Sequence, residues 1–480
     1  MKEGNPMEDL EVDGGSAALA ALIREHPAVV EATVIASTDG RGSTAWIVAD
    51  PRTALMLHRS AALEGAGRLG DLSWHEPADG LRVAGLNRGE TDFLYREIFI
   101  DDAYFRHMSG LPPKATVVDV GANIGMFTLR AALRSPGAHI VAVEPVAELA
   151  DAVMINAELH GVNATVVCAA AGDQTSQSAF TFYRHNSVMS GRLADSTHDR
   201  AVLKGYLLTG EDSEDTAQLD RMVADRMAPE LRRVPVTTLT QLASDLRLEH
   251  IDLLKIDVEK AEMQVLAGIA ETLWSRIDRV VMEVHDIEGR LAIVLDMLRA
   301  KGFAVNSDQD PRLLLTPCHT VYARRPEAVP SGAVQTVAMP GTGGPTLREL
   351  TQDLSRTATE RLPGAKFPQK LVLTNTLSSV PAGAGVSSPE RPHSATRRTA
   401  VLAEAWAALF GADAVRPDAD FFDLGGTSLL ALRLLDQVEQ ELGEGVLSVG
   451  TIFETGTFGA LAAAMEDARP AETATPSLDR

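Results

Sequence analysis

A glycine-bearing turn between an apolar strand and a helix constrains the fold more than any other feature of this sequence. Residues 117–120 read Val-Val-Asp-Val, Gly121 and Gly125 follow, and apolar residues at helical spacing begin at Met126. Glycine tolerates the backbone angles of a tight turn and lets a ligand approach the main chain closely. This order of strand, turn and helix is typical of α/β domains that bind a nucleotide-like cofactor.

Short apolar strands and helical segments alternate beyond residue 115. Further strands are expected at 139–143, 165–167, 251–256 and 280–284, and a helix is expected at 147–158. Such alternation predicts a parallel sheet covered by helices on both faces. The acidic stretch 209–220 is interpreted as a solvated loop, with a mobile lid as the alternative.

Composition and charge exclude several classes of protein. The chain has 480 residues, of which 45% are hydrophobic and 23% charged, so two to four globular domains are expected. A net charge of −22 repels phosphate backbones and anionic lipid, which argues against nucleic-acid and membrane partners. Two cysteines are too few for a disulfide framework or a four-thiolate zinc site. Because no apolar run reaches about 18 residues, a cytoplasmic protein is predicted.

The residues around the turn discriminate between cofactors. Glu144 and Pro145 end the next strand, where an acidic side chain can accept hydrogen bonds from both ribose hydroxyls. The Gly-x-Gly-x-x-Gly spacing of NAD enzymes is missing because residue 123 is Asn, and no phosphate-binding Gly-Lys-Ser/Thr loop occurs. Asp119 in the preceding strand suits a cofactor that has an α-amino group and no pyrophosphate, which describes S-adenosylmethionine (SAM). The alternative is a tight turn without a ligand.

Several strings of residues carry a family resemblance. VDVGANIGMFTL, VAVEP, IDLLKIDVEKAEMQVLAGI and VVMEVHD follow one another in this order. They resemble the FkbM family of SAM-dependent methyltransferases over roughly residues 92–325. The resemblance implies a Rossmann-like class I fold and transfer of the SAM methyl group to an acceptor, most often a hydroxyl. The cofactor-binding residues that it implies are Asp119, Gly121, Ala122, Asn123, Gly125, Phe127, Glu144, Pro145 and Asp173.

One residue departs from the family pattern. Lys260 stands where the family usually has Gly after Asp-Val-Glu. If that position requires a left-handed backbone or a close substrate approach, the lysine is expected to alter acceptor binding or to weaken activity.

Candidate catalytic residues follow two of the expected strands. Asp257, Glu259 and Glu262 come after one strand, and His285 comes after the other. Carboxyl ends of parallel strands meet at the ligand-binding edge of such a sheet. His285 is the preferred base because histidine titrates near neutrality; the alternative is a histidine satisfied by its neighbours. Asp257 is expected to contact cofactor or acceptor, with a structural cap as the alternative. No His-x-x-x-His pair occurs, so no metal is expected.

A second glycine motif lies near the end of the sequence. Residues 420–430 read Asp-Phe-Phe-Asp-Leu-Gly-Gly-Thr-Ser-Leu-Leu, which places Ser428 at the start of a helix. A helix N-terminus stabilises a phosphodiester; an ordinary Ser N-cap is the alternative. Residues 394–467 resemble the peptidyl carrier domains of nonribosomal peptide synthetases. The resemblance implies a four-helix bundle with 4′-phosphopantetheine attached to Ser428 by a phosphopantetheinyl transferase.

Two further segments, 16–55 and 329–390, resemble the two parts of the small C-terminal subdomain of adenylation domains. The methyltransferase, 56–328, would then be inserted between them. Residues 381–386 read Pro-Ala-Gly-Ala-Gly-Val instead of the usual Asn-Gly-Lys string, and the large nucleotide-binding domain is missing. No self-contained adenylation activity is therefore expected. Residues 1–15 and 468–480 are expected to be flexible.

Together these resemblances predict a carrier-linked methyltransferase of nonribosomal peptide or hybrid natural-product biosynthesis. O-methylation of an acyl or aminoacyl thioester on Ser428 is preferred, and N-methylation is the alternative within this class. The expected partners are a separate adenylation or acyl-loading enzyme and a downstream synthetase domain. The competing hypothesis is a noncatalytic carrier or scaffold module with a vestigial methyltransferase.

Overall fold

The computed structural model consists of two compact units, each built from separate stretches of sequence. One contains Met1–Ala84, Asp151–Asn163 and Gln335–Arg391, and the other contains Gly85–Ala150, Ala164–Val334 and Pro392–Arg480. The residues that the structure describes are 14–36, 42–78, 80–108, 110–197, 199–200, 203, 223–224, 226–310, 316–328, 344–380, 397–411, 414–422, 424, 428–442, 446–447, 451–452 and 455–467.

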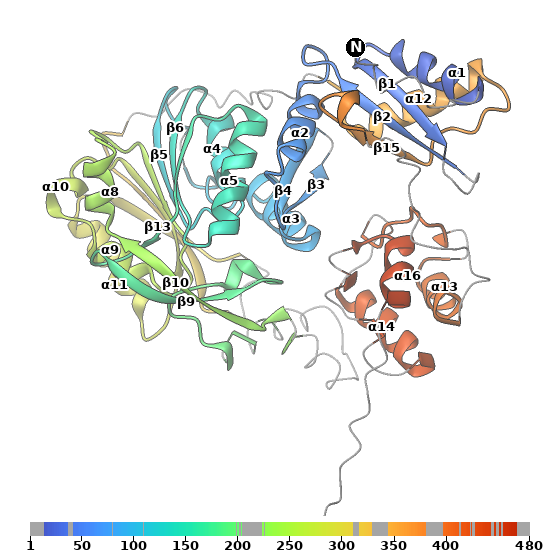
Figure 1. The fold of residues 1–480 in the computed structure, drawn as a ribbon. Coiled ribbons are helices and arrows are strands. Elements are labelled where there is room, and N and C mark those ends of the chain that lie inside the picture. The colour runs from blue at the N-terminus through green and yellow to red at the C-terminus, as the bar shows by residue number, and fades with distance from the viewer. Residues whose placement is uncertain are drawn as a thin grey trace, which may run out of the picture. The chain divides into compact units, whose positions relative to one another are not determined.

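A seven-stranded sheet forms the centre of the second unit (Figure 1). Its strands are β5 (Thr116–Val120), β6 (His139–Val143), β7 (Ala164–Val167), β11 (Leu253–Ile256), β12 (Arg279–His285), β13 (Ala304–Asp308) and β14 (Cys318–Arg324). They lie in the order β13-β14-β12-β11-β5-β6-β7, so the chain proceeds outward from β5 to β7 and then returns to the other side of β5. This reversal creates a switch point at the carboxyl ends of β5 and β11, where open α/β sheets bind ligands.

The predicted parallel pairing is confirmed for β5, β6, β7, β11 and β12. The edge of the sheet differs from the prediction, because β14 runs antiparallel to both β12 and β13. Strands β13 and β14 were not predicted from the sequence. The resulting order, with one reversed strand near an edge, is the Rossmann-like class I methyltransferase fold that was expected.

Alternation along the strands assigns residues to the two faces of the sheet. Val118 and Val120 share a core with helices α8 (Leu239–Asp245), α9 (Glu262–Ala267), α10 (Glu271–Trp274) and α11 (Arg290–Ala300). Val117 and Asp119 point to the opposite face, on which Figure 1 shows α4 (Met126–Arg134). Both faces are buried, so β5 is apolar apart from Asp119.

The second unit also contains a smaller sheet. Strands β9 (Ser176–Tyr183) and β10 (Pro229–Thr237) pair antiparallel, and β8 (Ala170–Ala171) pairs with β10 in parallel. After β9 the chain forms the short helix η2 (Ser187–Met189) and returns to pair Gly191 with Thr181. Helix α3 (Arg88–Tyr95) and the π-helix η1 (Arg96–Ile100) precede β5. This small sheet was not predicted from the sequence, and the stretch 209–220 lies outside the described residues.

The first unit joins the two distant segments into one sheet. Strands β1 (Val29–Ala36) and β2 (Ser43–Ala49) form the predicted antiparallel hairpin, and β15 (Lys370–Leu373) pairs with β2 in parallel. Its helices α1 (Gly14–Arg24) and α12 (Leu347–Arg361) contribute Ile23, Leu350 and Leu354 to a shared core. The two segments therefore complete one another, as an inserted domain requires.

The remaining elements of the first unit are α2 (Leu55–Gly65), β3 (Ser73–Ala78), β4 (Leu81–Gly85), the second part of α5 (Ala147–His160) and η4 (Leu377–Ser379). The unit extends to Ala84, beyond residue 56, where the inserted domain was predicted to begin.

The carrier-like segment contains, among its described residues, helices α13 (Arg397–Phe410), α14 (Ser428–Leu442) and α16 (Phe458–Asp467). Trp406 is fully buried at their centre and contacts Phe410, Phe421 and Phe458 edge-on, with ring centroids 5.3, 5.8 and 5.5 Å away. The predicted linker around residues 381–394 and both chain ends lie outside the described residues.

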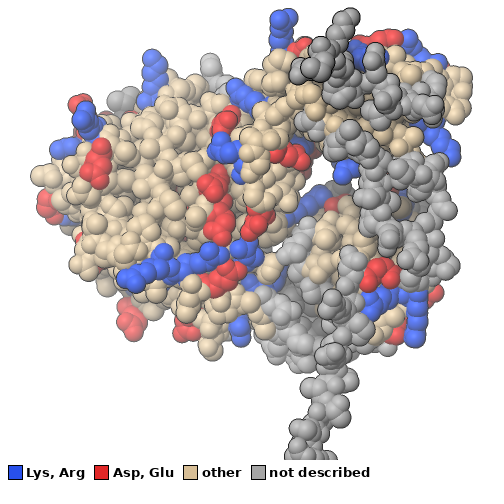
Figure 2. All heavy atoms as spheres, in the orientation of Figure 1, with Lys and Arg blue, Asp and Glu red and all other residues tan. Residues whose placement is uncertain are grey.

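Acidic and basic side chains are interspersed on the face shown in Figure 2. Some oppositely charged side chains of this protein pair locally: Arg184 lies 3.0 Å from Glu230, and Arg232 lies 3.1 Å from Glu148. Among the described helices, none combines the length and the apolar character needed to cross a bilayer.

Candidate active site

The turn between β5 and α4 has a geometry that requires glycine. Gly121 has a φ of +78°, and a Cβ at this position would lie 1.7 Å from the backbone oxygen of Asp257. Gly125, at φ +84°, forms the N-cap of α4. Asn123 between them also has a positive φ of 49°. The turn therefore passes directly against the end of β11 and exposes main-chain groups at the switch point.

Glu144 stabilises this turn from the end of β6. Its Oε2 accepts the backbone N–H of Asn123 at 2.8 Å, and its Oε1 accepts that of Val146 at 3.0 Å. Burial nevertheless raises the pKa of Glu144 to about 7, against the effect of these hydrogen bonds. Additional hydroxyl donors, such as those of a ribose, would therefore stabilise the ionised form of this carboxyl group.

Asp119 lies behind the turn. Its side chain is fully buried: Oδ2 accepts the Thr128 hydroxyl at 2.7 Å, and Oδ1 lies 3.3 Å from Lys255 Nζ. Its contact with a cofactor amino group stays a prediction. Lys255 donates to the carbonyl of Gly121 at 2.6 Å and also lies 3.3 Å from Asp257 Oδ2. Asp119 acts on the turn indirectly, through Lys255.

Lys255 keeps its charge in this buried setting. Burial opposes the ammonium, but Asp119 and Asp257 outweigh that effect and raise the pKa of Lys255 above its ordinary value. The lysine therefore joins the carboxyl ends of β5 and β11 by charge as well as by hydrogen bonds.

A cavity of about 390 Å³ opens at this switch point. Its wall includes seven of the predicted site residues: Gly121, Asn123, Glu144, Pro145, Asp257, Glu259 and His285. Ala122 and Gly125 shape the turn without reaching the wall, Phe127 stacks on Phe105 at 5.4 Å, and Asp173 is exposed elsewhere. Glu262 is fully buried behind the wall.

Carboxylates from β12 and from the turn after β11 converge on the cavity. Asp257, Glu259 and Glu283 bring carboxylate oxygens within 4.8 Å of one another. Asp257 also accepts the Tyr104 hydroxyl at 2.8 Å. Burial raises the pKa of Glu259 even though His285 opposes the shift, and burial together with Cys318 and Asp257 holds the pKa of Glu283 well above its usual range. Glu259 and Glu283 therefore retain protons more strongly than exposed glutamates do.

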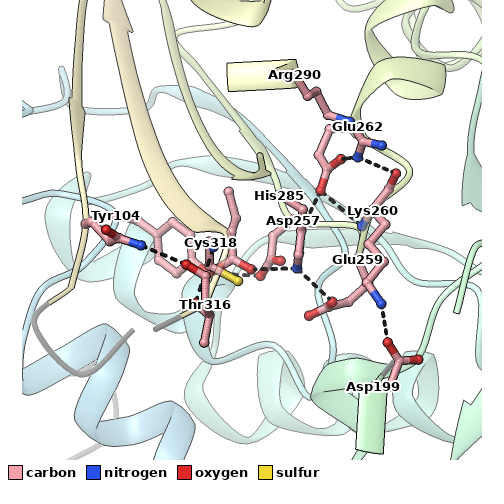
Figure 3. A network of polar contacts seen from close by, with 12 residues as sticks. Tyr104, Asp199, Asp257, Glu259, Lys260, Glu262, His285, Arg290, Thr316 and Cys318 are labelled. Carbon is pink, nitrogen blue, oxygen red and sulfur yellow. Dashed lines mark hydrogen bonds and ion pairs between the residues drawn. The ribbon is translucent and has the colours of Figure 1, made fainter. Parts of the chain in front are cut away.

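His285 lies within this acidic group (Figure 3). Its Nδ1 is 2.7 Å from Glu262 Oε1, and its Nε2 is 3.3 Å from Glu259 Oε2. Burial disfavours a charged imidazole, but Glu259 and the hydrogen-bonding neighbours outweigh burial and raise the pKa of His285 far above its ordinary value. These contacts fit the alternative, a histidine satisfied by its neighbours. The assignment of His285 as the general base stays a prediction.

Two groups of residues could in principle hold a metal ion at this site. Glu283, His285 and Cys318 form one, and Asp257, Glu259 and Glu283 form the other. In this structure both ring nitrogens of His285 face carboxylates, so a metal would have to displace the contact with Glu259.

Several residues at the site were not predicted from the sequence. Glu283 and Lys255 belong to the strings that carry the family resemblance, and a charged residue inside an apolar strand was a signal available for both. Glu90, Tyr104 and Ser187 come from segments without a recognised motif. Only tertiary contacts bring those three to the cavity.

Ser428 is the first residue of α14, as the sequence predicted. The buried Phe421 precedes it and anchors the connection to the core around Trp406. A helix of this length presents free N–H groups and a favourable dipole at its start, which suits a phosphodiester. Gly425, Gly426 and Thr427 lie outside the described residues.

Comparison with protein families identifies two domains. Residues 119–305 match the methyltransferase FkbM domain, and residues 400–465 match the phosphopantetheine attachment site. A methyltransferase domain of this type uses SAM, and the attachment domain carries 4′-phosphopantetheine. The glycine turn, Glu144 and the adjoining cavity fit SAM, because Gly121, Asn123 and Glu144 line the cavity together at the switch point.

Three curated proteins are similar to this chain. The 31-O-demethyl-FK506 methyltransferase FkbM of Streptomyces tacrolimicus is 41% identical over 248 residues, which are 52% of this chain and 95% of that protein. Methyltransferase 1 of Beauveria bassiana is 33% identical over 221 residues, 45% of this chain and 82% of that protein. The AMB antimetabolite synthetase AmbE of Pseudomonas aeruginosa is 34% identical over 450 residues, 86% of this chain. The matched region is about a fifth of the length of AmbE, at 20%.

Proposed function

This chain belongs to the FkbM methyltransferase family, and on that premise we propose that it methylates an acyl or aminoacyl group tethered to its own carrier domain. One observation carries the proposal: a SAM-dependent methyltransferase domain and a phosphopantetheine attachment domain occupy the same chain. The similarity to AmbE, which is named a synthetase, supports a setting in nonribosomal peptide or hybrid natural-product biosynthesis.

The glycine turn and Glu144 form the cofactor side of the proposed reaction. SAM, when bound, supplies an electrophilic methyl group. Gly121 and Asn123 line the cofactor side of the cavity, and the Glu144 carboxylate accepts the ribose hydroxyls while it holds the turn through the Asn123 N–H. Lys255 keeps the Gly121 carbonyl oriented at 2.6 Å. These contacts fix the direction from which the acceptor must approach.

The carboxylate group provides the acceptor side. Asp257, Glu259 and Glu283 line the cavity, and a carboxylate whose pKa lies nearer neutrality is a better proton acceptor than an exposed one. We assign to this group the removal of the acceptor proton. His285 holds Glu259 and Glu262 in position through its two ring nitrogens.

A hydroxyl is the proposed acceptor, and a tethered amine is the second candidate. The name of the S. tacrolimicus relative states O-methylation for that protein, which supports the hydroxyl. The phosphopantetheine arm on Ser428 would deliver the group, because tethering raises its effective concentration to about the millimolar range when the linker spans the gap.

Other proteins must complete this cycle. A phosphopantetheinyl transferase would modify Ser428, a separate adenylation or acyl-loading enzyme would charge the thiol, and a downstream synthetase domain would receive the product. The first unit, whose β2 and β15 come from the two adenylation-like segments, would serve as a platform without adenylation activity.

Intact-protein mass spectrometry tests the proposal. The chain is treated with a promiscuous phosphopantetheinyl transferase and a panel of hydroxyacyl and aminoacyl coenzyme A thioesters, and SAM is then added. A phosphopantetheine-acyl mass shift that Ser428→Ala abolishes and Ser378→Ala retains, followed by a gain of one methyl group, supports the proposal. No attachment at Ser428 contradicts it.

Loading without methylation would have two explanations: an unsuitable acceptor or an inactive methyltransferase. Two measurements separate these cases. Calorimetry with SAM tests for a vestigial cofactor site, which would show no binding. Single-turnover rates test the carboxylate group: Glu283→Gln should slow methyl transfer at least about a hundredfold, whereas the exposed control Glu271→Gln should not.

A further inference from the structure

The turn that follows β11 has a strained backbone. Glu259 and Lys260 are consecutive non-glycine residues with φ values of 45° and 69°. The left-handed conformation is unfavourable for a residue that carries a side chain. Such strain persists only where surrounding contacts determine the conformation, and it concentrates at functional sites.

Main-chain contacts hold part of this turn. The Lys260 N–H donates to Glu262 Oε1 at 3.0 Å, and Arg290 donates to the Lys260 carbonyl at 2.8 Å. Gly191 packs against the same turn so closely that a Cβ there would lie 3.0 Å from the Glu259 carbonyl oxygen. The turn and the chain after β9 are therefore in direct contact.

The Lys260 side chain adds a buried ion pair. Its ammonium pairs with Asp199, whose side chain is 1% exposed (Figure 3). The other oxygen of Asp199 accepts the Tyr183 hydroxyl at 3.0 Å. Removing one partner of a buried pair leaves an uncompensated charge, so the pair ties the two segments together strongly.

Residues 187–197 and 199, here called the wall segment, are held at both ends. Ser187 donates its hydroxyl to Glu90 at 2.7 Å and accepts the Asn123 side-chain amide at 3.0 Å. Ser187, Met189, Ser190 and Arg192 line the cavity. One end of the wall segment is thus joined to the cofactor turn through Asn123, and the other end is joined to the turn after β11 through Asp199.

We propose that Lys260 and Asp199 form a clamp that fixes the wall segment against the turn after β11, and that Lys260 is thereby a positioning residue for the methyl acceptor. The inference rests on the proposed function only in placing the acceptor in this cavity. It also explains why a lysine occupies a left-handed position: the ion pair offsets the backbone strain that glycine would avoid.

The test compares the double variant Lys260→Met/Asp199→Asn with the wild type. This variant removes both charges but keeps the side-chain volumes, so it avoids an unpaired buried charge. Lys260→Arg retains the pair, and Lys301→Met, which removes a half-buried lysine paired with the exposed Glu271, is the control. The measurements are hydrogen exchange with SAM bound, the SAM dissociation constant by calorimetry, and kcat and KM for the tethered acceptor.

In the double variant we expect amide exchange in residues 187–197 to accelerate at least about tenfold, while the SAM dissociation constant stays within about threefold because the Glu90–Ser187–Asn123 contacts remain. The kcat/KM for the acceptor should fall about tenfold or more, and Lys260→Arg should restore it. Unchanged exchange in the wall segment overturns the clamp. A loss of amide protection that the whole domain shares equally overturns it as well. Hydrogen exchange tests the clamp, and methyl transfer tests the proposed function. If the wild type methylates no tethered acceptor but the clamp governs exchange, the proposed function is wrong and the clamp stands.

Discussion

At the scale of single residues, Gly121 is the position where the structure tolerates substitution least. Both its φ of +78° and the Asp257 carbonyl oxygen, which would lie 1.7 Å from an added Cβ, oppose any other residue. Gly289 has a similar φ of +77° with open space around it. A substitution there therefore measures the cost of the backbone conformation without a steric clash.

We therefore expect Gly121→Ala to destabilise the protein by more than about 3 kcal/mol and to abolish SAM binding, since the backbone of two strand ends must move. Gly289→Ala should cost only about 1 kcal/mol. Urea unfolding and calorimetry measure both effects. Equal losses in the two variants would show that the contact with Asp257 has no consequence.

Glu144 gives the cofactor site a dependence on pH. Its pKa in the ligand-free protein is raised to about 7, and hydroxyl donors from a ribose favour the ionised form. Binding then releases a proton below pH 7, so SAM affinity should rise by up to about tenfold per pH unit between pH 5.5 and 7 and then level off.

Calorimetry across this range in wild type, Glu144→Gln and the exposed control Glu158→Gln measures the effect. The amide introduced by Glu144→Gln cannot ionise, so that variant should bind more weakly and lose the part of the pH dependence centred near 7. An unchanged profile in Glu144→Gln would refute the role of this carboxylate. For stability the sign is opposite: a raised carboxyl pKa means that the native state holds more protons between pH 4.5 and 7, so this group's contribution falls as pH rises through that window.

At the scale of secondary-structure elements, α12 depends on residues more than 300 positions before it in the chain. Leu350, Leu354 and Ala358 recur at helical spacing and are buried against the core that α1, β1 and β2 supply. Thr346 and Glu349 form a capping box that begins the helix. The element is locally well specified, but its apolar face is stabilised only by the distant first segment.

Leu354→Ala should destabilise the first unit by about 2–5 kcal/mol, because it leaves a cavity in a shared core. Arg356→Ala, on the exposed face with a side chain that is 69% exposed, should change stability by less than about 0.5 kcal/mol. Thermal unfolding followed by circular dichroism compares the two variants. A stable Leu354→Ala protein would mean that the two segments do not share a core in solution.

At the scale of the whole molecule, the two compact units have separate hydrophobic cores. We expect scanning calorimetry to resolve more than one unfolding transition. SAM at a hundred times its dissociation constant should stabilise only the unit that contains the cavity, by about 2.7 kcal/mol, and Leu354→Ala should lower only the other transition. A single transition that SAM and the mutation both shift as a whole would contradict this independence.

Much of the fold could be predicted because its signals are local. The glycine turn, the apolar strands at 117–120 and 139–143, and the helix start at Ser428 depend on neighbouring residues, and the structure contains each of them. Strands β13, β14, β9 and β10 were missed because each contains several polar or charged residues and none forms a short apolar run.

The candidate site likewise has features that could be predicted from local sequence and features that could not. Strand ends could be located from the amino-acid sequence without further information, and parallel strands bring their carboxyl ends together. That was enough to predict that five residues would meet at one edge of the sheet: Gly121, Glu144, Asp257, Glu259 and His285.

Three features of the site became visible only in the folded chain. Asp119 is buried and pairs with Lys255, carboxylates contact His285, and Lys260 pairs with Asp199. The physical reason is that charge states and ion pairs depend on burial and on partners distant in sequence, which no local pattern records.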